Sequence, residues 1–267
     1  MIYLIAIIQG IVEGLTEFLP ISSTGHLILS GHILGFTDER AKTFEIVIQL
    51  AAILAVVTLY FKRFLRFIPT SRNNKLRGFN GVHALKTLLI TSLPAVIAGF
   101  ILHDFVKDQL FQPLTVTVGL FIGGILLIFY ERFVPKPDTN ELDKITGKQA
   151  LGVGLAQIFS IWPGVSRAAS TIVGGSLLKL DRKTAVEYSF FAAVPVMVGA
   201  TALDLAKSMD NLSASDLPLF IIGMGVSYIT AMLAITYLLK YVQKHSLAIF
   251  GYYRIALAIL VFIILVL

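Results

Sequence analysis

Two short polar segments hold the side chains of this chain that could do chemistry. The first cassette, residues 13–26, reads EGLTEFLPISSTGH, and the second cassette, residues 162–167, reads WPGVSR. Together they place carboxylates, hydroxyls, an imidazole and a guanidinium inside a chain that is otherwise strongly apolar. Such groups are costly inside a membrane, so their presence indicates a functional site.

The acidic residues of the first cassette fall on one side of a predicted helix. Gln9, Glu13 and Glu17 recur every four residues, a spacing that puts all three on one helix face. Two carboxylates one turn apart repel each other unless a cation or a proton lies between them. We therefore expect Glu13 and Glu17 to bind a divalent cation, Mg²⁺ or Ca²⁺, or to share a proton as a base. The alternative is a pair of glutamates that line a wet crevice without chemistry.

Three hydroxyls and a histidine follow Pro20. Ser22, Ser23 and Thr24 are good N-cap residues for a helix that begins there, but capping accounts for one hydroxyl and not for three beside His26. The chain has no cysteine, so a nucleophile must come from oxygen or imidazole. These side chains are therefore candidate catalytic groups. The alternative for His26 is a packing or hydrogen-bonding role.

The second cassette repeats the pattern of the first. An offset of 143 residues aligns the prolines of the two cassettes and superposes Ser23 on Ser166 and Thr24 on Arg167. Each cassette is predicted to break one helix and start the next, so that two helix N-termini meet near the middle of the membrane and favour an anion. Arg167 adds a full charge and a planar fork suited to phosphate. The alternative for Arg167 is an internal ion pair with a glutamate of the first cassette.

The amino-acid composition indicates which class of protein contains these groups. Of 267 residues, 56% are hydrophobic and 14% are charged, and the mean hydropathy is +0.83, outside the usual range of soluble proteins. We predict an all-α polytopic membrane protein. The net charge of +6 does not indicate a nucleic-acid partner, because the basic residues gather in particular loops. No basic segment precedes the first apolar stretch, so we expect no cleaved signal peptide.

Six segments are long and apolar enough to cross roughly 30 Å of hydrocarbon as transmembrane helices. They are residues 43–62, 84–103, 113–130, 185–205, 217–239 and 247–267. Residues 1–35 and 148–180 are each divided by a cassette into shorter pieces. We predict that both regions are re-entrant helical hairpins, whose broken backbone must be covered by protein or face a water-filled cavity.

The basic residues set the predicted orientation. Four loops carry 16 of the lysines and arginines, namely 62–86, 131–149, 179–184 and 240–246. The positive-inside rule makes these loops cytoplasmic, so both termini and the opening of the site are predicted to be extracytoplasmic. The two hairpins then enter from opposite sides. Within one membrane domain, residues 1–267, we predict an inverted-topology repeat of residues 1–134 and 145–267. Arg254, near a cytoplasmic helix end, is expected to snorkel to the membrane surface.

The two cassettes closely resemble the signature motifs of the bacterial undecaprenyl pyrophosphate phosphatase family, known also for bacitracin resistance. The residues KTFE at 42–45 and GATALD at 199–204 are also similar to that family, and the resemblance runs along essentially the whole chain. One departure is that Ala168 and Ala169 stand where the family commonly has Ser-Gly. Ser170 could supply that hydroxyl instead.

The resemblance implies an enzyme of the bacterial cytoplasmic (inner) membrane that hydrolyses undecaprenyl pyrophosphate, a C55 isoprenyl lipid, to undecaprenyl phosphate and phosphate. The product returns to cell-wall synthesis as a lipid carrier. As a hypothesis, Ser23 attacks the terminal phosphorus and His26 or a glutamate accepts the proton. Glu13 and Glu17 hold the cation on the pyrophosphate, and Arg167 stabilises the charge of the transferred group.

Other roles follow from the same hypothesis, and alternatives to it exist. Ser22, Thr24 and Ser166 would orient phosphate oxygens, and His26 as a phosphohistidine nucleophile is a rival to Ser23. The expected partners are the lipid substrate and membrane lipids, with no nucleic acid, and the chain could form a homodimer.

Inverted repeats with broken helices are also the plan of secondary transporters, so the chain could instead flip a phosphorylated isoprenoid lipid or carry a small anion. Hydroxyls beside carboxylates favour an enzyme, because a carrier needs no nucleophile.

Overall fold

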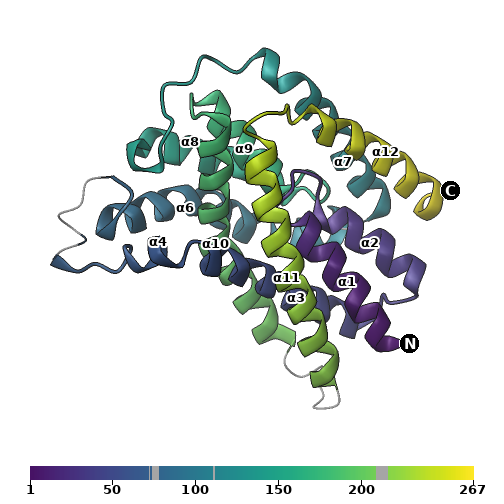
Figure 1. The fold of residues 1–267 in the computed structure, drawn as a ribbon. Helices are drawn as coiled ribbons and strands as arrows, with labels where there is room; N and C mark the ends of the chain where they lie inside the picture. Colours follow the sequence, from purple (N-terminus) through teal and green to yellow (C-terminus); the bar gives the residue numbers. More distant parts are fainter. Residues whose placement is uncertain (72, 74–77, 111, 209–215) are drawn as a thin grey trace.

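The computed structural model describes the chain except for residues 72, 74–77, 111 and 209–215, and the described part is helical (Figure 1). The longer helices are α1 (Ile2–Thr16), α2 (Ser23–Leu34), α3 (Glu39–Leu59), α6 (Gly81–Phe105), α7 (Pro113–Phe129), α8 (Gly147–Gln157), α9 (Arg167–Leu177), α10 (Arg182–Ser208), α11 (Leu217–Tyr241) and α12 (Ala248–Leu265). Short helical turns are α4 (Phe61–Leu65), η1 (Val106–Leu110), η2 (Tyr130–Arg132), η3 (Leu142–Lys144) and η4 (Ile158–Ile161).

Six of the described helices are long and apolar enough to cross a membrane. They are Glu39–Leu59, Gly81–Leu102, Pro113–Arg132, Arg182–Ala202, Leu217–Tyr241 and Ala248–Leu265. They coincide with the six predicted segments, so the prediction of a multi-pass, all-helical membrane protein is confirmed. Large apolar side chains cover their outer faces, as expected for a surface in contact with lipid; Phe100 is 85% exposed and Ile101 is 72% exposed.

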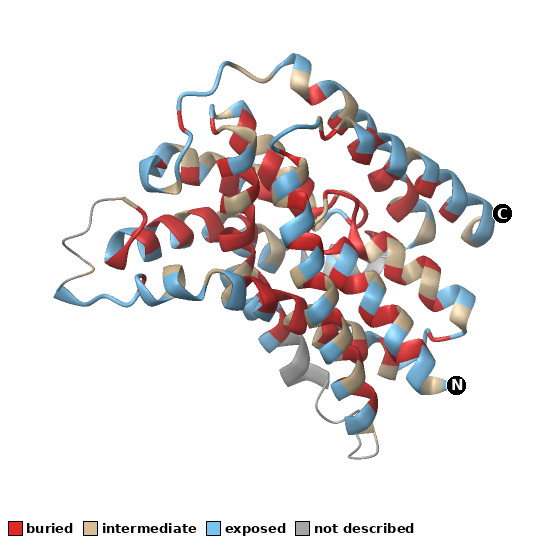
Figure 2. Cartoon of the chain, in the orientation of Figure 1, coloured by how far each residue is buried: buried red, intermediate tan, exposed pale blue. Residues whose placement is uncertain are grey.

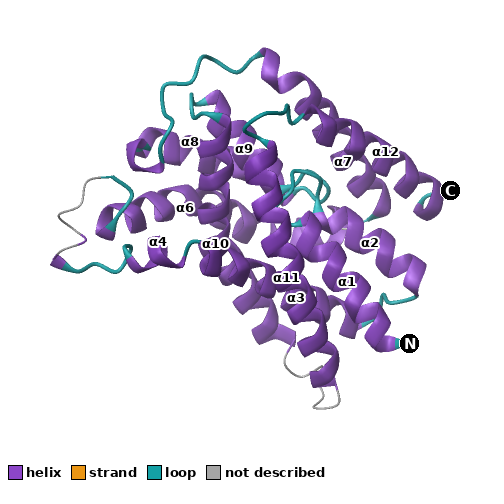
Figure 3. Ribbon diagram, in the orientation of Figure 1, coloured by secondary structure: helices purple, strands orange, loops and turns teal. Residues whose placement is uncertain are grey.

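The helices beside the two cassettes are too short to cross a membrane alone. Helix α1 has 15 residues, α2 has 12, and α8 and α9 have 11 each. At a rise of 1.5 Å per residue even α1 is only about 22 Å long. The first cassette joins α1 to α2, and the second lies between η4 and α9. Figure 3 shows connecting loops in the interior of the bundle, between α9 and α2.

The helices pack in pairs that bring distant parts of the chain together. Helix α1 lies against α11, α8 against α6, α3 against α10, and α7 against α12. Buried residues gather where these helices meet, and exposed residues cover the outside (Figure 2). The buried ring of Phe18, in the first cassette, meets the ring of Phe190 edge-on with centroids 5.5 Å apart. The first cassette is therefore anchored in the core by an aromatic contact with α10.

Candidate active site

Each cassette contains one serine with an unusual backbone conformation. Ser22 and Ser166 have φ angles of 71° and 75°, in the left-handed region that non-glycine residues rarely adopt. The Ser22 hydroxyl accepts the N–H of Gly25 at 3.4 Å, and the Ser166 hydroxyl accepts the N–H of Ala169 at 3.2 Å. Both serines are therefore N-caps of the helix that follows, α2 and α9 respectively.

These matched caps correct the register predicted from the two prolines. Ser22, and not Ser23, is the counterpart of Ser166, which is an offset of 144 residues. In this register Ser23 corresponds to Arg167, and each is the first residue of its helix. The two positions that carry the candidate nucleophile and the candidate phosphate-binding cation are thus structurally equivalent.

Both cassettes line one polar pocket of about 160 Å³. Its lining residues come from the cassettes, η4, α3 and α10, and they are Glu17, Ser22, Ser23, Thr24, Gln49, Ser160, Pro163, Gly164, Ser166, Arg167 and Met197. Helices α2 and α9 both begin at this pocket, so their positive dipole ends favour an anion in it. The pocket contains six of the eight predicted site residues. Glu13 and His26 are not among its lining residues.

One carboxylate connects the candidate nucleophile to the candidate cation. The Ser23 hydroxyl donates to Glu17 Oε2 at 2.5 Å, and Arg167 Nη2 donates to Glu17 Oε1 at 3.1 Å. The side chains of Glu17 and Arg167 are only 5% and 11% exposed, so their attraction is weakly screened by water. Glu17 is therefore held in place by Arg167 with one oxygen on the hydroxyl that it could deprotonate.

Arg167 is positioned by further contacts from α10 and from the first cassette. Its Nη1 donates to the backbone carbonyl of Ser189 at 3.0 Å and to the Ser189 hydroxyl at 3.2 Å. Its guanidinium carbon lies 5.6 Å from the centre of the Phe18 ring. The buried Nε has no hydrogen-bond partner among the described residues. Ser189 was missed by the sequence analysis; a serine inside the apolar run of α10 was the available signal.

His26 is turned toward α12. Its Nδ1 donates to the carbonyl of Ser22 at 2.7 Å, and its Nε2 lies 2.7 Å from the hydroxyl of Tyr253. A nitrogen that bonds a carbonyl must carry the proton, so the neutral ring accepts the tyrosine hydroxyl at Nε2. The two rings also stack with centroids 5.5 Å apart. Both nitrogens are thus engaged away from Ser23, and Tyr253 is a partner that the sequence analysis did not find.

Glu13 is buried in α1 one turn before Glu17, on the same helix face, as the spacing predicted. Its side chain is fully buried, and neither carboxylate oxygen has a hydrogen-bond partner in the described part of the chain. The Nε2 of buried Gln9 is likewise without a partner there. A buried carboxylate in this state needs a proton or a cation. No group of three His, Cys, Asp or Glu side chains suited to a metal occurs among the described residues.

Two expectations about residues near the second cassette are wrong. Arg254 does not snorkel: its side chain is fully buried and donates to backbone carbonyls, including those of Gly164 and Val165, both at 2.8 Å. Ser170 does not supply a pocket hydroxyl. It donates to the carbonyl of Ser166 at 3.1 Å, one turn back in α9, and it does not line the pocket.

This chain is similar to known proteins over nearly its whole length. Residues 6–260 match the family described as bacitracin resistance protein BacA. The chain is 54% identical over 260 residues to undecaprenyl-diphosphatase 1 of Bacillus thuringiensis (strain Al Hakam), covering 96% of each protein. It is 54% identical over 258 residues to undecaprenyl-diphosphatase 1 of Bacillus anthracis, with 96% and 95% covered. It is 48% identical over 256 residues to undecaprenyl-diphosphatase of Maridesulfovibrio salexigens, with 96% of each covered.

Proposed function

The chain belongs to the bacitracin resistance protein BacA family, and on this premise we propose that the pocket between the cassettes hydrolyses undecaprenyl diphosphate. The protein is a membrane-embedded phosphatase that releases undecaprenyl phosphate and inorganic phosphate. The observation that carries the assignment of the site is the contact of Ser23 with Glu17 at 2.5 Å, beside Arg167. It supplies a nucleophile, a base and a phosphate-binding cation within one small pocket.

The proposed reaction begins at Ser23. Its oxygen bonds the terminal phosphorus while the proton passes to Glu17 Oε2, and the bond from that phosphorus to the bridging oxygen breaks. The lipid monophosphate leaves with the bridging oxygen. Water then attacks the phosphorus of the phosphorylated serine, the bond from that phosphorus to the serine oxygen breaks, and inorganic phosphate leaves with the oxygen and hydrogens of the water. Glu17 returns its proton to the serine oxygen and so restores both groups. Arg167 stabilises the charge that develops on the transferred phosphoryl group, and its place in the pocket lining beside Ser23 supports this role.

The remaining pocket hydroxyls suit the orientation of phosphate oxygens. Ser22, Thr24 and Ser166 all line the pocket at the N-terminal ends of α2 and α9. Positive helix ends favour the negatively charged diphosphate, so these groups would bind substrate before any chemistry occurs. The engagement of both His26 nitrogens favours Glu17 as the base and gives His26 a supporting role between the first cassette and Tyr253.

The carboxylate of Glu13 suits a divalent cation. The two unpartnered, buried oxygens of Glu13 are of the ligand type that Mg²⁺ and Ca²⁺ prefer, whereas both oxygens of Glu17 already have partners. Glu13 would therefore be the principal ligand, with Glu17 as its neighbour. When bound, such an ion would offset negative charge on the diphosphate.

Removal of the cation is expected to abolish phosphate release. Glu13→Gln should raise the cation concentration needed for half-maximal rate by roughly tenfold or more, because it removes a charged ligand. Glu39→Gln, a matched change at a side chain that is 70% exposed, should not alter that concentration. The measurement is phosphate release from a C55 diphosphate in detergent, titrated with Mg²⁺ or Ca²⁺ after chelation. Full activity in excess chelator would leave Glu13 without a metal role.

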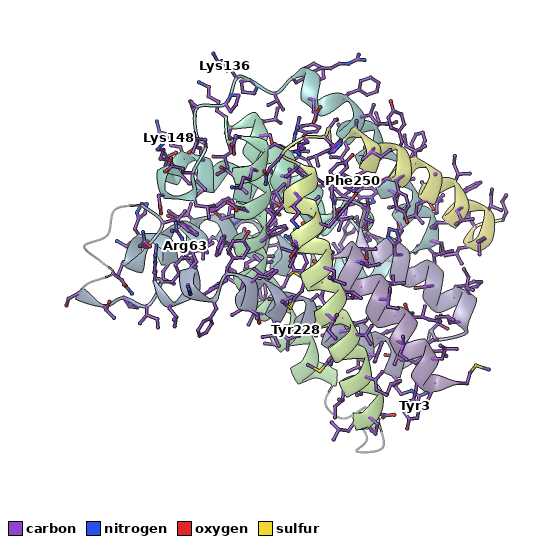
Figure 4. All side chains as sticks on the ribbon, in the orientation of Figure 1. Tyr3, Arg63, Lys136, Lys148, Tyr228 and Phe250 are labelled. Carbon is purple, nitrogen blue, oxygen red and sulfur yellow. The ribbon has the colours of Figure 1, made fainter. Side chains whose placement is uncertain are left out.

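The helix pairing supports an inverted-topology repeat with two re-entrant hairpins. Each half of the chain supplies a short helical hairpin, α1–α2 or α8–α9, followed by three long helices. The first helix of each half packs against the second long helix of the other half: α1 against α11, and α8 against α6. This is expected if the halves, residues 1–134 and 145–267, are related by a two-fold axis. Arg63, Lys136 and Lys148 lie on the side of the molecule away from Tyr3 in Figure 4, in keeping with cytoplasmic basic loops and extracytoplasmic termini.

This orientation can be tested with single cysteines, because the chain contains none. Thr37, exposed between α2 and α3, is on the predicted extracytoplasmic side, and Lys136 is on the predicted cytoplasmic side. Thr37→Cys should react with a membrane-impermeant thiol reagent in intact bacterial cells, whereas Lys136→Cys should react only after the cells are permeabilised. The reverse pattern would place the termini and the pocket opening on the cytoplasmic side.

Three further expectations belong to this proposal. The protein resides in the bacterial inner membrane, where its lipid substrate and membrane lipids surround it. It could act as a homodimer, which light scattering of the purified protein would test. A carrier for phosphorylated lipids or small anions is not favoured, because the relatives carry the names of enzymes.

A further inference from the structure

We propose that Arg254 is a positioning residue that fixes the two cassettes relative to each other, an inference that rests on the proposed function. Arg254 lies in α12, far along the chain from both cassettes, and its side chain is fully buried. It does not line the pocket. Any effect on hydrolysis must therefore pass through the backbone that it holds.

Every N–H group of the Arg254 guanidinium has a carbonyl partner. Nε donates to Leu120 at 3.4 Å, Nη1 to Pro20 at 3.3 Å and to Val165 at 2.8 Å, and Nη2 to Gly119 at 3.1 Å and to Gly164 at 2.8 Å. One planar group thus connects the first cassette, the second cassette and α7. Arginine suits this role because its five donors have a fixed geometry.

The packing of α7 against α12 leaves space for this side chain. A Cβ built at Gly123 would lie 2.7 Å from the guanidinium carbon of Arg254, closer than real contacts allow. A Cβ at Gly124 would lie 2.8 Å from the carbonyl oxygen of Gly251. The glycines therefore allow the helix backbones to approach and the guanidinium to reach the cassettes.

The hydrogen bonds reach the backbone next to the two unusual serines. Pro20 precedes Ser22 by two residues, and Gly164 and Val165 directly precede Ser166. Both serines have positive φ angles, a conformation that persists only where surrounding contacts enforce it. Holding these segments sets the distance between the N-termini of α2 and α9.

That distance matters because the first residues of α2 and α9 are Ser23 and Arg167. In the described part of the chain the hydrogen-bond partners of Arg254 are backbone carbonyls and not carboxylates, so its charge is balanced by dipoles. Burying a charge in this way is costly, which argues for a role that an apolar side chain could not fill.

The test compares Arg254→Lys with Leu257→Ala, which removes buried volume from the same helix, in the apolar cluster that contains Leu29 and Val261. A displacement of about 1 Å can cost roughly 10²-fold in rate, so Arg254→Lys should lower kcat by about 100-fold. KM should change by less than about threefold, because the pocket groups that bind the diphosphate remain. Leu257→Ala should lower the thermal stability but leave kcat near that of the parent.

A distance measurement gives a readout that does not depend on turnover. Spin labels at Leu19→Cys, in the first cassette, and at Phe159→Cys, in η4 just before the second cassette, should give a narrow distance distribution in the parent. Arg254→Lys should broaden or shift that distribution, and Leu257→Ala should not. If the parent releases no phosphate, the proposed function fails, while the distance distribution still decides the role of Arg254.

A second variant moves the guanidinium without removing it. Gly123→Ala should reproduce the loss of kcat and the broadened distribution, whereas Gly225→Ala, where an added Cβ meets nothing within 4 Å, should do neither. The proposal is overturned if Arg254→Lys keeps the parental kcat, or if it loses kcat with the distance distribution unchanged.

Discussion

Ser23→Ala is expected to lower phosphate release on the order of 10⁴-fold or more, while binding of the lipid diphosphate stays within a few fold. The loss is large because the hydroxyl held 2.5 Å from Glu17 is the proposed nucleophile, and removing a nucleophile removes the covalent route. Binding should persist because Arg167 and the N-terminal ends of α2 and α9 remain. The measurements are phosphate release and direct binding of a C55 diphosphate in detergent.

Ser170→Ala is the matched control for this substitution. It deletes the same hydroxyl from a serine of α9 that donates to Ser166 and does not line the pocket, so its rate should stay near that of the parent. Brief reaction with labelled substrate should give an acid-stable phosphoserine. If Ser23→Ala keeps substantial turnover while His26→Ala abolishes it, and the label is acid-labile, the histidine mechanism replaces the serine mechanism.

Arg167→Ala is expected to weaken both substrate binding and turnover. Each charge-assisted hydrogen bond to phosphate that is lost should cost about 1.5 to 3 kcal/mol, and the loss of one donor to the developing charge typically lowers kcat by roughly 10² to 10³-fold. The variant also leaves Glu17 without its ion-pair partner at 3.1 Å, so the position of the proposed base should loosen. Measured kcat and KM should therefore both worsen.

Arg167→Lys should recover little of this loss. An ammonium keeps the charge, but it cannot reach Ser189, Glu17 and a phosphate with the planar fork of a guanidinium. Arg182→Ala serves as the control, because it breaks an ion pair of 2.8 Å with Glu131 outside the pocket lining. Its kcat per folded molecule should be unchanged. Parental kcat in Arg167→Lys would show that charge alone suffices.

The arrangement at Ser23 marks the limit of what spacing can predict. Spacing put Gln9, Glu13 and Glu17 on one helix face, and the structure has them so. Spacing could not assign different roles to Glu13 and Glu17, because the environment of each carboxylate depends on residues distant in the chain. Glu17 meets Arg167 across 150 residues, whereas Glu13 is buried without a partner among the described residues.

The amino-acid sequence by itself determined the six membrane-spanning helices, the two helix breaks and the polar cassettes at those breaks. These features are local: an apolar run of about 20 residues, a proline and a capping serine each act over a few neighbouring residues. Tertiary structure decided the register of the two cassettes, since φ angles at Ser22 and Ser166 show which serine is the cap. It also decided the partners Ser189, Tyr253 and Arg254. Their contacts join residues up to 234 positions apart, and which side chains meet at such separations depends on how the helices pack.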